Sequence, residues 1–193
     1  MKIGLYFGSF NPIHVGHLII ANHLAEHSDL QQIWFVVTPH NPLKDKKTLL
    51  EDQQRLHLVK LATENYPKLK TSDIEFKLPQ PNYTVNTLTY LVEKFPENEF
   101  CIIMGEDNLK SFHKWKNFEI IKQNHEIYVY PRISSDLVEN YNHADSKIHK
   151  INAPIIEISS TEIRDGIKNQ KNIRPLLSEK VWEYVEHNNL YKK

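Results

Sequence analysis

The chain has 193 residues, enough for one domain with a buried core, and its 40% hydrophobic and 25% charged residues are typical of a soluble globular protein. Its 24 basic and 24 acidic residues balance, whereas proteins that bind nucleic-acid polymers usually carry excess positive charge. We therefore expect small charged metabolites as partners, and no nucleic acid polymer. A single cysteine, Cys101, excludes an internal disulfide, and no apolar run is long enough for a signal peptide or a membrane span. These features predict a cytoplasmic protein without a membrane partner, and leave open whether it forms a homo-oligomer.

Short apolar runs alternate with segments of helical period along the chain. Strands are predicted at 3–7, 33–37, 69–78, 100–104, 126–130 and 155–158, and helices at 15–27, 50–64, 84–95 and from Ser178 onward. This alternation predicts an α/β fold: a single Rossmann-like domain over residues 1–193, with a doubly wound, mostly parallel sheet and helices on both faces. Ligands of such sheets bind beyond the carboxyl ends of the strands, so the segments that follow strands are the places to search.

The segment GSFNPIHVGH, residues 8–17, directly follows the first strand. Gly8 allows close approach of the backbone to a ligand, and Pro12 stiffens the turn. The next helix is predicted to begin near residue 15, so its free N–H groups, together with the imidazoles of His14 and His17, are suited to bind a phosphate. Zinc is the competing interpretation, but zinc-binding HExxH helices space their histidines by four and hold a carboxylate between them. A third interpretation makes one histidine a helix cap and the other a packed residue.

Two further segments follow predicted strands. The loop 38–47 carries Lys44, which lies nearest the strand end and could reach a phosphate, whereas Lys46 and Lys47 have the character of a solvated loop. In the segment 104–115, Gly105 ends a strand, and a carboxylate two residues later could bind a sugar hydroxyl or cap a helix. The tryptophan that ends this segment could belong to the core or stack on a flat heteroaromatic ring.

The segment EISSTEIRDGI, residues 157–167, has the pattern of a second anion site. Ser159 followed by Glu162 fits a capping box, which predicts a helix start. The free N–H groups of that helix, the hydroxyls of Ser160 and Thr161, and the guanidinium of Arg164 could all bind phosphate. A plain capped helix with a surface arginine is the alternative.

These two motifs resemble the signatures of the α/β-phosphodiesterase nucleotidylyltransferases, Gly-x-Phe-x-Pro-x-His-x-Gly-His and Ser-Ser/Thr-x-x-Ile-Arg. Within that superfamily, the chain is most similar over nearly its whole length to the bacterial nicotinate-nucleotide adenylyltransferase family. The supporting segments are NYTVNTL at 82–88, GED at 105–107, the tryptophan at position 115 and, in part, NPLK at 41–44. The sequence departs from the family pattern at Asn11 and Asn86, where aspartate is common, and at Glu106, where a small residue is usual.

The resemblance implies that the phosphate of nicotinate mononucleotide attacks the α-phosphorus of ATP, giving deamido-NAD and pyrophosphate for NAD biosynthesis. Magnesium would be carried by the ATP phosphates, with no protein ligand. Catalysis would rest on holding and neutralising phosphates, by His14, His17, Lys44 and Arg164. The residues implied to bind ATP are Gly8, Ser9, Phe10, His14, His17, Gly105, Asp107, Ser160, Thr161 and Arg164. Those implied to bind the pyridine nucleotide are Lys44, Thr84, Trp115 and Arg132.

Two other functions stay open at this level. The first is adenylyl transfer to nicotinamide mononucleotide or to phosphopantetheine, although the NYTVNTL segment and Trp115 favour a pyridine ring over a pantetheine arm. The second is a non-catalytic nucleotide sensor, against which the complete set of histidines, lysine and arginine speaks. The choice between the acid and the amide of the mononucleotide depends on backbone donors, which the sequence does not reveal.

Overall fold

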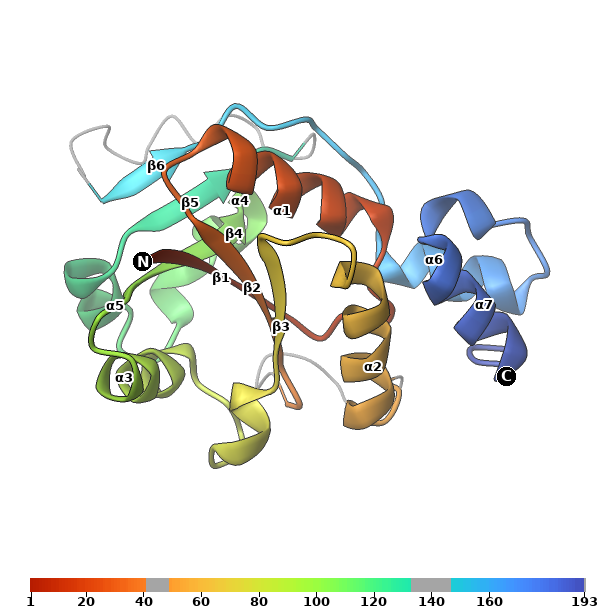
Figure 1. Ribbon diagram of the computed structural model, residues 1–193, viewed down its shortest axis with the longest axis horizontal. Coiled ribbons are helices and arrows are strands. Elements are labelled where there is room, and N and C mark those ends of the chain that lie inside the picture. Colours follow the sequence, from red (N-terminus) through yellow and green to blue (C-terminus); the bar gives the residue numbers. More distant parts are fainter. Residues whose placement is uncertain (41–48, 133–146, 193) are drawn as a thin grey trace.

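The computed structural model describes residues 1–40, 49–132 and 147–192, and its centre is a six-stranded, wholly parallel sheet with the strand order β3-β2-β1-β4-β5-β6 (Figure 1). The strands are β1 (Lys2–Gly8), β2 (Gln32–Val37), β3 (Leu69–Ser72), β4 (Glu99–Gly105), β5 (Ile127–Tyr130) and β6 (Ile148–Lys150). The predicted α/β fold with a Rossmann-like parallel sheet is confirmed. In the described part of the chain, no helix is long and apolar enough to cross a membrane.

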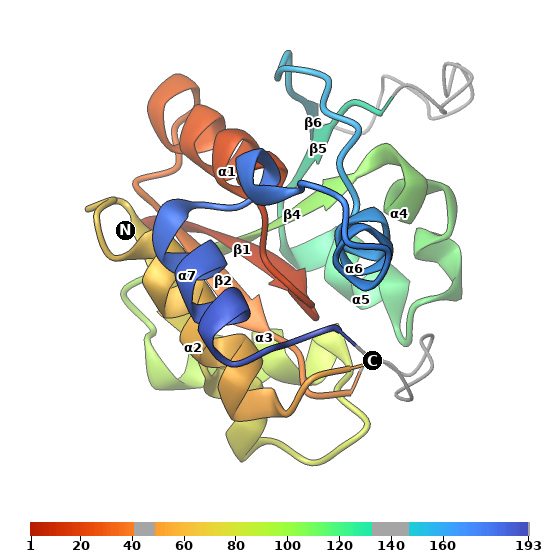
Figure 2. The ribbon, with the colours of Figure 1, turned by 90° about the vertical axis from the view of Figure 1, so that its right-hand side faces the viewer.

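Helices cover both faces of the sheet. The first face carries α1 (Val15–His27), α2 (Asp52–Thr63), α6 (Ser160–Lys168) and α7 (Glu179–His187), and the second carries α3 (Thr84–Lys94), α4 (Glu106–Lys110) and α5 (Phe118–Asn124). Because side chains alternate along a strand, each strand supplies both cores: Leu5 packs with the second group of helices and Tyr6 with the first. Figure 2 shows α7 alongside α2, where the rings of His57 and Tyr184 lie 4.6 Å apart.

The order of the strands fixes where a ligand can bind. From β1 the chain moves outward in one direction through β2 and β3, then returns to the other side of β1 to form β4. The carboxyl ends of β1 and β4 therefore flank the topological switch point, where open parallel sheets hold their ligands. The segments after these two strands are the ones that carry Gly8 and Gly105.

Two of the predicted strands were wrong: the strand at 69–78 in part, and the strand at 155–158 completely. Only the beginning of 69–78 is a strand; from Ile74 to Lys77 the chain forms a 3-10 helix, η1, which buries Ile74 and Glu75. Residues 155–158 form no strand, because Ile155 is 56% exposed and the segment leads directly into α6. The last strand lies earlier, at 148–150, and pairs in parallel with β5.

The predicted helix starts agree with the structure. Helix α1 begins at Val15, and α6 begins directly after a complete Ser159–Glu162 capping box. Ser178 occupies the N-cap position of α7, although its hydroxyl makes no capping hydrogen bond. The short helices α4 and α5, and the 3-10 helices η2 (Phe112–Lys114) and η3 (Arg174–Leu176), were not predicted.

Candidate active site

The loop after β1 depends on a strained residue at its centre. Phe10 has a φ of 46°, in the left-handed region that bulky side chains rarely adopt. Its ring is 2% exposed and packs edge-on against Phe35 and His17, with ring centres 5.4 and 5.1 Å away. Gly8 makes room for this ring, because a Cβ at residue 8 would lie 2.8 Å from it. Any contact of Phe10 with ATP must therefore come from its backbone, while its side chain holds His17.

His14 and His17 lie at the amino end of α1 with their rings stacked, 3.7 Å between centres. The backbone N–H of His14 donates to Nδ1 of His17 at 3.3 Å, which leaves Nε2 of a neutral His17 as the protonated nitrogen. His14 occupies the N-cap position, 4% exposed, and its Nδ1 has no hydrogen-bond partner among the residues that the structure describes. The two imidazoles and the first N–H groups of α1 are thus close enough to bind one anion together.

The protonation state of His14 follows from its surroundings. Burial, aided by the Arg132 guanidinium, lowers the pKa of His14 to about 4, and the Glu162 carboxylate acts in the opposite direction. At neutral pH, His14 is therefore an uncharged imidazole that can donate one hydrogen bond. Arg132, and Glu162 in the first turn of α6, are thus near enough to influence the charge of His14.

The second motif of the sequence packs directly on the first. The Ser160 hydroxyl donates to the carbonyl of Pro12 at 2.8 Å, across a separation of 148 residues. The Arg164 guanidinium donates to the carbonyl of Asn11 at 2.8 Å and to the Thr161 hydroxyl at 3.1 Å. The amino ends of α1 and α6 therefore pack against the same loop, between Gly8 and His14.

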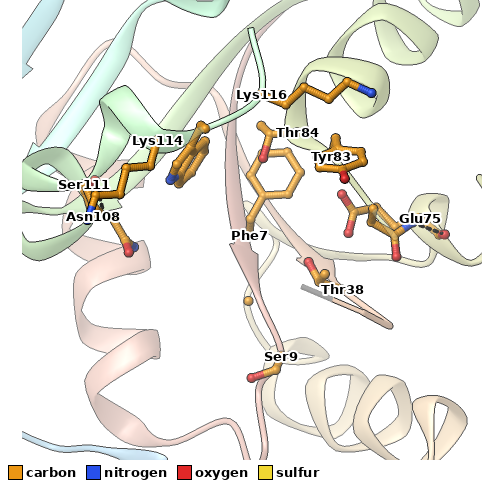
Figure 3. Close-up of a pocket in the computed structure, with 13 residues that line it drawn as sticks. Phe7, Ser9, Thr38, Glu75, Tyr83, Thr84, Asn108, Ser111, Lys114 and Lys116 are labelled. Atoms are coloured by element: carbon orange, nitrogen blue, oxygen red, sulfur yellow. Dashed lines mark hydrogen bonds between the residues drawn. The ribbon is translucent and has the colours of Figure 1, made fainter. Parts of the chain in front are cut away.

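A cavity of about 460 Å³ opens beside this surface (Figure 3). It is lined by Phe7, Gly8, Ser9, Thr38, Glu75, Asn82, Tyr83, Thr84, Asn108, Ser111, Lys114, Trp115 and Lys116. The structure thus brings together Thr84 and Trp115, both predicted for the pyridine nucleotide, with Ser9 of the loop after β1. The Trp115 indole packs edge-on against Phe112, which fixes it at the cavity wall.

The charges at this cavity favour an anion. Lys114 and Lys116 line it, and the Lys116 ammonium lies 4.4 Å from the centre of the Tyr83 ring. Helix α3 begins at Thr84 with no acidic residue in its first turn, so the positive end of its dipole faces the cavity uncompensated. These lysines flank Trp115 in the sequence HKWK, and that local pattern is the signal that could have identified them.

The residues predicted to bind ligands at the carboxyl ends of β4 and β5 lie in different environments. Gly105 ends β4 where a Cβ would lie 3.1 Å from the Tyr130 ring, and Asp107 is exposed in the first turn of α4. The Glu106 carboxylate accepts a hydrogen bond from the backbone N–H of Arg132 at 3.1 Å, which gives the unusual glutamate a structural role. Arg132 donates to the carbonyl of Ile156 at 3.3 Å and does not line the cavity that holds Thr84 and Trp115.

The structure also shows the surroundings of Asn11 and Asn86, the other two departures from the family pattern. Asn11 is 2% exposed, and its Oδ1 accepts from the backbone N–H of Leu50 at 3.1 Å and from the Tyr191 hydroxyl at 3.0 Å. It therefore ties the loop after β1 to the segment just before α2 and to Tyr191 near the end of the chain, a role that needs no negative charge. Asn86 is exposed in the first turn of α3. Lys44 lies outside the described residues.

Arg55 is a residue of the site that the sequence did not reveal. Its side chain is wholly buried behind the loops, and its guanidinium donates to the carbonyls of Ser9 at 2.6 Å and Thr38 at 2.9 Å. Asp52 supplies the counter-charge at 2.5 Å. One side chain thus joins the loops after β1 and β2, both of which line the cavity. In the sequence, it looks like any polar residue on an amphipathic helix.

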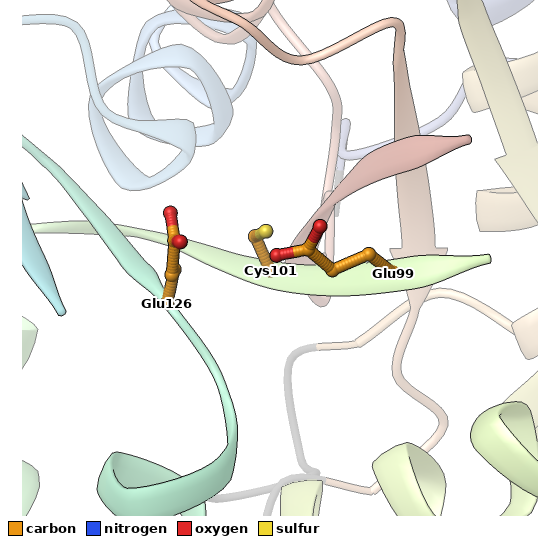
Figure 4. A group of neighbouring side chains, drawn as sticks. All are labelled: Glu99, Cys101 and Glu126. Carbon is orange, nitrogen blue, oxygen red and sulfur yellow. The ribbon is translucent and has the colours of Figure 1, made fainter.

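One group of possible metal ligands lies away from this crevice. Glu99, Cys101 and Glu126 approach one another at the amino-terminal edge of the sheet, with all three ligand atoms within 4.8 Å (Figure 4). The Lys2 ammonium lies among the carboxylates, 2.8 Å from Glu126 and 4.0 Å from Glu99. Burial also raises the pKa of the Cys101 thiol to about 12, so it is not a thiolate ligand at neutral pH. In this structure the carboxylates of the cluster form an ion-pair network around Lys2.

A family model described as cytidylyltransferase-like matches residues 5–166, so the chain is a nucleotidyltransferase of that class. A protein of Flavobacterium psychrophilum, named as a probable nicotinate-nucleotide adenylyltransferase, is 72% identical over the full length of both chains. A protein of the same name from Flavobacterium johnsoniae is 68% identical, again over all of both chains. The chain belongs to the nicotinate-nucleotide adenylyltransferase family.

The solved structures agree on the fold. The nicotinic acid mononucleotide adenylyltransferase of Plasmodium falciparum, in complex with NaAD, superposes with a TM-score of 0.83. The alignment covers 98% of this chain and 97% of the other at 21% identity. The Rossmann-like architecture is therefore retained where most of the sequence has changed.

Proposed function

We propose that the chain transfers the adenylyl group of ATP to nicotinate mononucleotide, giving deamido-NAD and pyrophosphate. Family membership supports the reaction, and one structural observation supports its location. The cavity lined by Thr84 and Trp115 opens next to Ser9, in the same loop that leads to His14 and His17. An acceptor whose ring occupies the cavity would thus direct its phosphate toward the triphosphate site, as an in-line displacement requires.

The residues at the crevice would act by binding and neutralising phosphates. His14 and His17, with the amino end of α1, would hold the ATP phosphates, and His17 Nε2 would stabilise the charge that develops as the bond to pyrophosphate breaks. From the other side, Ser160, Thr161 and Arg164 would bind the triphosphate. Because the nucleophile is already a phosphate anion, no general base is needed, which agrees with an uncharged His14.

The remaining predicted contacts, except that of Arg132, keep their roles in this proposal. Gly105 and Asp107 would face the adenosine ribose, and Gly8, Ser9 and the Phe10 backbone would border the nucleotide. Lys44 would neutralise a phosphate of the acceptor. For Arg132 the nearness of His14 favours a role at the phosphates over one at the pyridine ring.

Magnesium would enter on the triphosphate, where it supplies positive charge. The groups described at this crevice are mainly imidazole, hydroxyl and guanidinium donors, which suit phosphate oxygens and not a hard cation. The ion would therefore keep phosphate and water ligands.

The electrostatics of the cavity favour the acid over the amide as acceptor. Lys114, Lys116 and the positive end of α3 would all attract the carboxylate of nicotinate, whereas a neutral nicotinamide would gain little from them. Trp115 would stack on either ring. We therefore propose nicotinate mononucleotide as the preferred substrate, ahead of nicotinamide mononucleotide and phosphopantetheine.

Pyrophosphate release with ATP and each of the three acceptors tests this proposal. We expect the highest kcat/KM with nicotinate mononucleotide. Fastest release with phosphopantetheine would overturn the substrate assignment. Tight binding of ATP without release of pyrophosphate under any acceptor would instead favour a nucleotide sensor.

A further inference from the structure

The loop after β1 is held by a residue 180 positions further along the chain. Tyr191 follows α7, and its hydroxyl donates a hydrogen bond to Oδ1 of Asn11 at 3.0 Å. The backbone N–H of Leu50, just before α2, donates to the same oxygen at 3.1 Å. Because Asn11 is 2% exposed, its side chain is enclosed together with these partners. One oxygen of the loop thus joins two segments that are distant in the sequence.

The backbone after α7 adopts an uncommon conformation that brings Tyr191 to the loop. Asn189 and Tyr191 have φ values of 50° and 64°, in the left-handed region that residues with side chains rarely adopt. The first value belongs to the helix end, where the N–H of Leu190 donates to the Val185 carbonyl at 3.0 Å, as in a Schellman motif. The second lies beyond that motif. A strained φ persists where surrounding contacts stabilise it, and the bond from Tyr191 to Asn11 is such a contact.

The Tyr191 hydroxyl lies near two arginines that bind the same loop. Burial raises the pKa of this hydroxyl, and the guanidinium groups of Arg164 and Arg55 act in the opposite direction. At neutral pH the hydroxyl is therefore protonated and donates. Arg55 donates to the Ser9 carbonyl at 2.6 Å, and Arg164 donates to the Asn11 carbonyl at 2.8 Å. Three side chains from three different segments therefore hold this loop.

The contacts of the loop divide between the two substrates of the proposed reaction. Gly8 and Ser9 line the cavity assigned to the acceptor, whereas Asn11 does not. Asn11 leads instead to His14, and its carbonyl accepts from Arg164. The proposed function assigns both of these residues to the ATP phosphates. A shift of Asn11 would thus displace groups at the triphosphate and leave the walls of the cavity in place.

We propose that Tyr191 is a positioning residue for ATP, whose hydroxyl acts through Asn11 to hold the loop and Arg164 in the arrangement that binds the triphosphate. The inference rests on the proposed function, since that function supplies the location of the triphosphate. Tyr191 contacts neither substrate in this assignment. Because it fixes only the triphosphate side of the loop, its loss should weaken binding of ATP and spare the acceptor.

Calorimetric affinities for ATP and for nicotinate mononucleotide test this assignment without turnover. Tyr191→Phe removes the hydroxyl and keeps the ring. We expect it to weaken binding of ATP by about 3- to 10-fold, as loss of one hydrogen bond does, and to leave that of the mononucleotide within about twofold. The matched control is Tyr184→Phe, since Tyr184 is another partly buried tyrosine of this region, whose ring packs against His57 in α2. This control should change neither affinity, and thermal unfolding verifies the fold of both variants.

A double-mutant cycle tests whether Asn11 transmits the effect. In an Asn11→Ala background the hydroxyl of Tyr191 has lost its acceptor, so adding Tyr191→Phe should change the affinity for ATP by less than about twofold. A tyrosine that only stabilised the fold would weaken ATP binding equally in both backgrounds.

Three outcomes would overturn the assignment. Equal weakening of both ligands by Tyr191→Phe would mean that the hydroxyl supports the whole crevice and not the triphosphate side. An unchanged affinity for ATP would mean that the loop keeps its position without the hydroxyl. An undiminished effect in the Asn11→Ala background would exclude Asn11 as the link. Each is distinct from failure of the proposed function, which would be seen as absence of pyrophosphate release by the wild type.

Discussion

At the amino-terminal edge of the sheet the chain pairs charged side chains with one another, whereas at the carboxyl-terminal edge two buried polar atoms have no partner among the described residues. At the first edge, the Lys2 ammonium lies 2.6 Å from Asp29 and 2.8 Å from Glu126. At the second edge, His14 Nδ1 and Glu75 Oε2 are buried and have no hydrogen-bond partner in the described part of the chain. The residues that resemble metal ligands lie at the paired edge, and the cavity lies at the other.

The difference shows which feature indicates function. Clustered carboxylates beside a cysteine resemble a set of metal ligands. Here, however, the Lys2 ammonium lies among the carboxylates and already neutralises their charge. Unsatisfied imidazole and carboxyl atoms cost stability in the free protein, as does the positive φ of Phe10.

The largest expected effect is that of His17→Ala, at the unpaired edge. This change removes a donor held in place by Phe10 and by the backbone of His14, so kcat should fall by ~10²-fold or more, as loss of one preorganised donor does elsewhere. Steady-state pyrophosphate release measures it, and circular dichroism verifies the fold. Lys2→Met, at the paired edge, is the matched control and should retain the kcat of the wild type. A folded His17→Ala protein with normal turnover would contradict the role given to His17.

The two motifs and the helix starts at this edge were predictable from the sequence because their signals are local. GSFNPIHVGH and ISSTEIR each combine a turn or a cap with a helix start, and such patterns depend on neighbours within a few residues. The strands were equally clear where apolar runs were short and continuous. The two motifs touch through Ser160 and Pro12, a contact between residues 148 positions apart that no local pattern predicts.

Glu75 and Arg55 could not be predicted because their environment is tertiary. Glu75 lies in a segment whose alternating pattern indicates a strand with the carboxylate outside, but a 3-10 helix turns it inward against Thr87. Arg55 occupies a helix whose other polar residues are solvated, and only the carbonyls of two distant loops make its burial favourable. The local pattern of polar and apolar residues therefore predicts neither contact.

The second prediction concerns the protonation of His14. Its pKa of about 4 in the folded protein lies below the ordinary value of 6.5, so the unfolded chain binds more protons between these pH values. The free energy of unfolding should therefore fall as the pH drops through this window, by about 2 kcal/mol from pH 7 to pH 5. Urea denaturation of the wild type and of His14→Asn at both pH values isolates this contribution. An equal loss in the two proteins would mean that His14 titrates normally, as would an NMR titration midpoint near 6.5.

The smallest effect is expected at the paired edge, and it should appear in stability alone. Lys2→Met leaves Asp29 and Glu126 without their cation, which should lower the free energy of unfolding by about 1 kcal/mol, since Asp29 is largely exposed. Hydrogen bonds from Lys2 lower the pKa of both carboxyls, so this contribution is present at neutral pH and is lost as the pH falls through their titration. The wild type and the variant should thus differ in urea at pH 7 and converge in acid. A loss of kcat in this variant would show that the two edges are coupled, because no residue of the Lys2 cluster lines the cavity.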